Sequence, residues 1–109
     1  MIIQLVSVSV PSGKRHELAP ALSWLAASML VQEGCLACRL YRAWPEQDEW
    51  HIEARWKSME NLHCHLRSDV CKQMLQLMEM STVTPSLEFF SVLELRGLDL
   101  VEAVRMPVD

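Results

Sequence analysis

A chain of 109 residues, 50% of them hydrophobic, has the size of one domain and can bury a core without disulfides or metal. Its net charge of −4, with no basic run longer than Lys14-Arg15, argues against nucleic acid as a partner. No apolar stretch approaches the roughly 18 residues that a membrane span needs, and the N-terminus lacks the features of an export signal. We therefore expect a cytoplasmic protein with no membrane partner.

The first two predicted elements are a strand and a helix. Residues 2–10 alternate valine with serine, which is typical of a strand, and Pro11 ends it. Over 14–33 the large apolar residues recur at steps of three and four, which predicts a helix with one buried face. Gly34 is expected to end this helix. Pro20 lies inside this range, so we expect the helix either to start late or to kink there.

Two strands and two helices follow. Residues 35–42 and 49–56 are typical of strands and predict a hairpin, because turn-forming residues separate them. Ser58 and Ser68 each predict the start of a helix, since a serine hydroxyl can accept a hydrogen bond from a free N–H group of the first turn. We expect these helices to end at Leu66 and near Met80.

The last part of the chain completes the fold. Residues 87–95 predict a fourth strand, and 96–109 form a tail that we expect to be a short helix or strand contacting a partner subunit. The order β-α-β-β-α-β predicts an α+β, ferredoxin-like domain over 1–95, with an antiparallel four-stranded sheet and helices on one face.

The other face of the sheet has no cover of its own in this plan. Its predicted side chains mix apolar with polar and charged groups, so a second copy is the expected cover and the protein is expected to be a homodimer. These side chains are Ile3, Leu5, Phe90 and Val92 together with Arg39, Tyr41, His51 and Glu53.

The cysteines and histidines do not converge in these elements. Cys35 and Cys38 form a C-x-x-C, but three residues apart on a regular strand they point to opposite faces. His63 and His65 are two residues apart on a helix, which also separates them. The sequence thus predicts free thiols in preference to a metal site or a redox dithiol.

Large apolar residues near the third strand and the last helix define a candidate pocket. Trp50 and Trp56 share the strand face that points toward the helices, and methionines follow on the last helix. They form either a plain core or the wall of an apolar cavity, and His65 is either a helix-surface histidine or the acid or base of that cavity. The candidate substrate-binding residues are Trp50, Trp56, Leu62, Met74, Met78 and Phe89.

A family resemblance supports the pocket interpretation. Trp56-x-Ser58, followed at fixed spacing by Leu62-x-x-His65-Leu66, resembles the antibiotic biosynthesis monooxygenase family, and the likeness covers about residues 2–95. It implies a dimeric α+β barrel whose members oxidise aromatic quinols or polyketides with dioxygen, without metal or flavin. It also implies that His65 is the catalytic proton acceptor for a small aromatic or apolar substrate.

The sequence departs from the family at one position of the third strand. Members often carry a glutamate two residues before the tryptophan, where this chain has Ala54, and Glu53 points the other way by parity. The residues of the haem-degrading branch are not matched either. The alternative function is therefore a non-catalytic, dimeric binding module for an apolar small molecule.

Overall fold

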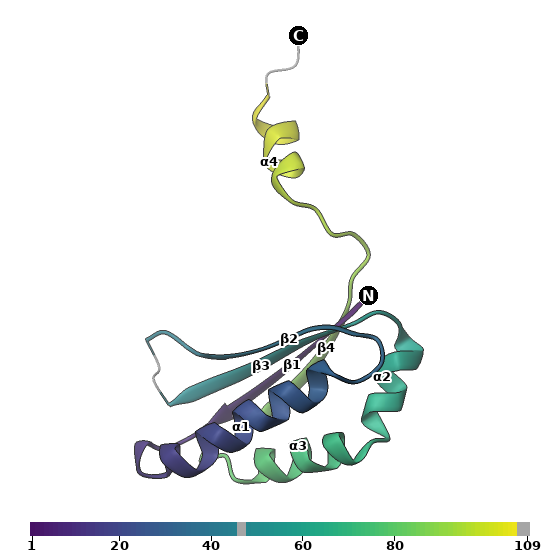
Figure 1. Ribbon diagram of the computed structural model, residues 1–109. Helices are drawn as coiled ribbons and strands as arrows, with labels where there is room; N and C mark the ends of the chain where they lie inside the picture. Colours follow the sequence, from purple (N-terminus) through teal and green to yellow (C-terminus); the bar gives the residue numbers. More distant parts are fainter. Residues whose placement is uncertain (46–47, 107–109) are drawn as a thin grey trace.

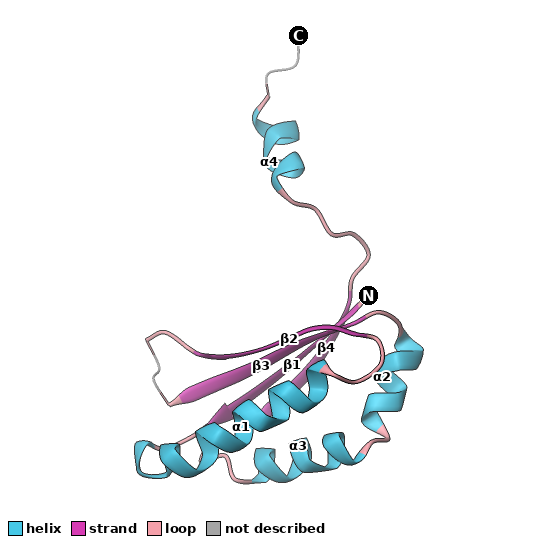
Figure 2. Ribbon diagram, in the orientation of Figure 1, coloured by secondary structure: helices cyan, strands magenta, loops and turns pink. Residues whose placement is uncertain are grey.

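The computed structural model describes residues 1–45 and 48–106 and confirms the predicted α+β, ferredoxin-like fold. Its four strands form one sheet in the order β2-β3-β1-β4, in which every pair is antiparallel. The helices α1 to α3 lie together on one face of this sheet (Figures 1 and 2). The elements are β1 (Ile2–Ser9), α1 (Arg15–Leu30), β2 (Cys35–Arg42), β3 (Glu49–Trp56), α2 (Met59–Leu66), α3 (Asp69–Glu79), β4 (Ser86–Ser91) and α4 (Leu98–Arg105).

The core lies between the sheet and the three helices. Alternate residues of β1 are buried, beginning with Ile2 and Gln4, because successive side chains of a strand point to opposite faces. Trp56 and Ala54 of β3 are fully buried on the same side. From α1 and α3 the core receives Leu22, Leu25, Met29, Cys71 and Met74.

Serine caps fix the starts of α2 and α3, as predicted. The hydroxyl of Ser58 accepts a hydrogen bond from the N–H of Asn61, and that of Ser68 accepts one from the N–H of Cys71. Each cap satisfies a backbone donor that the helix itself leaves free. The caps therefore mark where the chain turns into each of these two helices.

The first helix differs from its prediction at both ends. It begins at Arg15 after a 3-10 turn (Ser12–Lys14) and contains Pro20, so of the two alternatives for Pro20 the late start is wrong. It ends at Leu30, and Gly34 lies in the turn before β2 with φ +80°. A Cβ at Gly34 would meet the side chain of Asn61 on α2, so this turn needs glycine for two reasons.

The predicted orientation of the two C-x-x-C cysteines is wrong. A register shift between Cys35 and Ala37 places Cys35 opposite Trp56 and Cys38 opposite Ala54, and both thiols pack against the core. Such a bulge adds one residue to a strand, so a spacing of three brings two side chains to the same face. All four cysteines carry free thiols in this structure.

The fourth strand is shorter than predicted. It ends at Ser91 because its partner strand begins at Ile2, which pairs with Ser91. One more backbone hydrogen bond follows the last pair, from the N–H of Val92 to the carbonyl of Met1.

The uncovered face of the sheet carries the predicted mixture of side chains. Ile3 lies opposite Phe90, Leu5 opposite Glu53, and Tyr41 stacks on the ring of His51 with 5.2 Å between centroids. None of the helices of the described residues lies against this face (Figure 1).

The tail leaves the body of the molecule. Residues 93–106 are exposed throughout, and α4 stands apart from the sheet and the other helices (Figure 1). Positions 107–109 of the predicted tail lie outside the described residues. Within the described part of the chain, none of the helices has the length and hydropathy that spanning a membrane demands.

Candidate functional site

A buried polar network lies between α2 and the sheet, and His65 is its centre. The ring of His65 stacks on the indole of Trp56, with 4.7 Å between centroids and 22° between planes. Only 1% of His65 is exposed, and Trp56 is fully buried. The alternative of a helix-surface histidine is therefore excluded.

The hydrogen bonds of this network fix the tautomer of His65. Its Nδ1 lies 2.6 Å from the amide oxygen of Gln32, which can only accept, so the proton is on Nδ1. The Nε2 then accepts from the side-chain amide of Gln4 at 3.4 Å. The amide oxygen of Gln4 accepts from the indole N–H of Trp56 at 2.9 Å, which fixes the orientation of that amide.

The remaining polar atoms of the network also have partners. The Gln4 amide approaches the sulfur of Met74 at 3.3 Å, and the Gln32 amide donates to the hydroxyl of Ser68 at 3.1 Å. That hydroxyl donates to the carbonyl oxygen of His65 at 2.6 Å. A fully satisfied network of this kind holds its members in one arrangement.

Burial lowers the pKa of His65 to about 4, so its imidazole is neutral at pH 7. The lone pair on Nε2 is its acceptor site. The bond that Nε2 receives from Gln4 is the longest of those made by the ring. This is the position at which a bound hydroxyl could most easily replace a protein partner.

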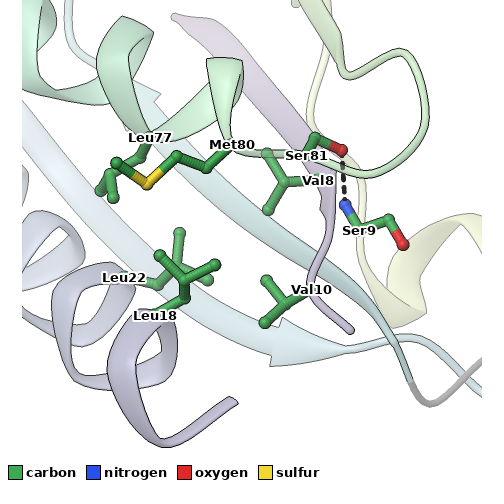
Figure 3. Close-up of a pocket in the computed structure, with 8 residues that line it drawn as sticks. All are labelled: Val8, Ser9, Val10, Leu18, Leu22, Leu77, Met80 and Ser81. Atoms are coloured by element: carbon green, nitrogen blue, oxygen red, sulfur yellow. Dashed lines mark hydrogen bonds between the residues drawn. The ribbon is translucent and has the colours of Figure 1, made fainter. Parts of the chain in front are cut away.

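An apolar gap lies next to this network, between α1 and α3 and above β1; we call it the α1–α3 gap. The outer part of the gap has a free volume of about 10 Å³, which is room for about one water molecule. At its edge the N–H of Ser9 donates a hydrogen bond to the hydroxyl of Ser81 at 2.9 Å (Figure 3). Side chains from the three elements and from the residues just after β1 and α3 line this part: Val8, Val10, Leu18, Leu22, Leu77 and Met80.

The gap continues inward past Val8, Leu22 and Leu77, where Trp50, Met74 and Met78 join the lining. Side chains fill this inner part completely, so a ligand could enter only if some of them moved. The methionines are suited to such movement because their unbranched side chains adopt many shapes.

The predicted site residues fall into two groups that Met74 connects. Trp50, Met74 and Met78 line the α1–α3 gap, while Trp56 and His65 belong to the network that reaches Met74 through Gln4. The other two predicted residues lie apart: Leu62 is buried in the core, and Phe89 lies opposite Gln4 on β4 with 42% of its surface exposed. Their roles in binding or catalysis stay predictions.

Sequence reasoning missed Gln4 and Gln32. Gln4 could have been found, because it shares the buried face of β1 with Ile2 and Val6, where an amide needs buried partners. Gln32 carries no such signal, since it lies in the turn between α1 and β2.

The metal-ligating side chains stay scattered. Within residues 1–45 and 48–106, no three of the His, Cys, Asp and Glu side chains come together in a way that could hold an ion. Cys64 is exposed on α2 and Cys71 is buried on α3. Burial, and to a lesser degree the nearby Cys35, raises the pKa of Cys38 to about 12.

One family model matches most of the chain. The family model described as antibiotic biosynthesis monooxygenase matches residues 1–77. A search of curated proteins finds no significant match.

Solved structures share the fold. A Deinococcus radiodurans protein provisionally described as such a monooxygenase has a TM-score of 0.79 at 17% identity, covering 89% of this chain and 97% of that one. A similarly described Caulobacter crescentus protein has a TM-score of 0.73 at 23% identity, with coverages of 85% and 90%. A Bacteroides thetaiotaomicron protein of unknown function, described as a candidate oxidoreductase, has a TM-score of 0.70 at 26% identity, with coverages of 82% and 95%.

Proposed function

Because the chain belongs to the antibiotic biosynthesis monooxygenase family, we propose that it oxidises a small aromatic quinol or polyketide-like substrate with dioxygen, without metal or flavin. In the simplest such reaction an aromatic CH₂ group and O₂ give a ketone and one water, so the substrate supplies all the electrons. The protein has to hold the substrate in a dry site and accept a proton from it.

The observation that carries this proposal is the neutral His65 next to an apolar gap. Its Nε2 can accept a proton, and its low pKa ensures that the site is unprotonated at pH 7. For a substrate to reach it, the amide of Gln4 must turn away from Nε2, which breaks the 3.4 Å contact. The Nδ1 bond to Gln32 keeps the ring oriented meanwhile and would stabilise the imidazolium that forms.

Oxygen consumption tests the proposal. Purified protein in chelator-treated buffer should consume O₂ with anthrone or a naphthalene-diol and should lose this activity in His65→Ala. The matched control is His63→Ala, which changes an exposed histidine of the same helix and should keep the activity. If no substrate of the panel raises O₂ consumption above that of His65→Ala, the proposed monooxygenase reaction is wrong.

A second candidate is a non-catalytic binding module for an apolar small molecule. Two observations favour it: both ring nitrogens of His65 already have protein partners, and the fully buried Ala54 offers no carboxylate where family members often have one. A binder should be stabilised against heat by anthrone-like ligands that it never oxidises. Thermal shifts measured alongside O₂ consumption separate the two candidates.

The uncovered sheet face supports a homodimer as the working unit. Its apolar side chains Ile3, Leu5 and Phe90 lie among charged groups, a composition suited to a two-fold contact. The exposed α4 would then contact the partner subunit. We expect Leu5→Glu to dissociate or unfold the protein and Glu60→Lys, on α2, to leave it intact. Wild-type protein that sediments as a compact monomer at micromolar concentration would contradict the dimer.

A further inference from the structure

Trp50 carries a buried hydrogen-bond donor without an acceptor. Its indole Nε1 is inaccessible to water and makes no hydrogen bond to any atom of the described residues. Buried tryptophans usually place this N–H on an acceptor, as Trp56 does on Gln4. Leaving such a donor unpaired destabilises the fold, so its presence here needs a reason.

The surroundings of Trp50 explain why the donor has no partner. The residue lies opposite Val8 of β1 and Arg42 of β2, on the face of β3 that points toward the helices. The guanidinium of Arg42 lies 5.2 Å from the centre of its ring and can only donate. On the other sides the gap supplies aliphatic side chains and the weakly accepting sulfurs of Met74 and Met78.

We propose that the N–H of Trp50 recognises an oxygen on the ligand of the α1–α3 gap, a ketone or phenolate oxygen on an otherwise apolar ring. The inference rests on the proposed function to the extent that it takes this gap as the ligand site. It adds which residue selects the ligand, and for which chemical group. His65 would act on the reacting carbon or hydroxyl, while Trp50 holds an oxygen elsewhere on the ring system.

The unpaired donor makes the gap selective by a simple mechanism. A hydrocarbon that enters the gap leaves the N–H of Trp50 unpaired, whereas a ketone of the same shape satisfies it. Sites that offer a hydrogen bond reject an analogue lacking the partner group more strongly than apolar sites reject a change in size. This donor, on a residue that lines the inner gap, would therefore decide between ligands that fit equally well.

Matched ligands and variants test this inference by calorimetric titration of the full chain. The two probes are 1-tetralone, which has one ketone, and tetralin, which has the same rings without it. We expect wild type to bind 1-tetralone about tenfold more tightly than tetralin, the effect of one desolvated hydrogen bond. Trp50→Phe keeps an aromatic ring but removes the N–H, and should bind both probes with nearly equal affinity.

The control is Trp24→Phe, which makes the same chemical change at a half-exposed position of α1 and should keep the preference for the ketone. The inference is wrong if Trp50→Phe keeps the preference, if wild type shows none, or if wild type binds neither probe. These outcomes do not depend on oxidation. A ketone preference lost in Trp50→Phe, with no O₂ consumption for any substrate, would support the inference and reject the proposed reaction.

Discussion

Acidification should destabilise this protein through His65 by an amount that its burial sets. Burial lowers the pKa of His65 from the ordinary 6.5 to about 4. Between these values the unfolded chain binds the proton and the folded chain does not, so the free energy of unfolding falls as the pH drops from 6.5 to 4. The stabilisation is complete above about pH 6.5. One pKa unit corresponds to about 1.4 kcal/mol, so the loss amounts to about 3 kcal/mol.

Urea unfolding of wild type and His65→Gln at pH 7.5 and pH 4 measures this loss. Other groups titrate in the same range, but they contribute equally to both proteins and cancel in the difference. Wild type should lose about 3 kcal/mol more than the variant over this interval. Protein concentration is kept constant because association would shift the apparent stability. A wild type and variant that lose the same free energy, within about 0.5 kcal/mol, would refute a buried neutral imidazole.

Two further predictions concern stability at neutral pH. Gln4→Met should lower the free energy of unfolding by about 2 to 4 kcal/mol in the same urea assay, because it leaves the N–H of Trp56 and the Nε2 of His65 unpaired. The control is Gln76→Met at an exposed position, which should change the free energy of unfolding by less than about 0.5 kcal/mol. Gly34→Ala should lower the melting temperature strongly, because the φ of Gly34 is +80° and the added methyl group would meet α2. The control is Gly13→Ala, which has open space around it and should leave the melting temperature unchanged. Equal melting temperatures for the two variants would contradict the described turn.

Periodicity was sufficient to predict the elements, and local irregularities account for the errors. The alternation of β1 and the serine caps of α2 and α3 act within a few residues, so a sequence shows them directly. The bulge after Cys35 depends on the pairing of β2 with β3, about twenty residues away, and no residue in the C-x-x-C predicts it. The early end of β4 likewise depends on where β1 begins.

Sequence reasoning named the apolar residues of the candidate site and His65, but missed the polar partners of His65. Tryptophans and methionines at strand and helix spacing indicate a shared apolar layer, and Trp50, Met74 and Met78 do meet there. The partners of His65 come from two distant segments of the chain, through Gln4 and Gln32, and only the folded arrangement brings them together.

The distribution of the four cysteines gives the wild-type chain a built-in labelling position. Cys64 is the exposed one, whereas burial raises the pKa of Cys35, Cys38 and Cys71 and keeps their reactive thiolate forms scarce at neutral pH. A maleimide dye should therefore attach first to Cys64, directly before His65 on α2. Its fluorescence would report movement of that helix as a ligand enters, without any engineered residue.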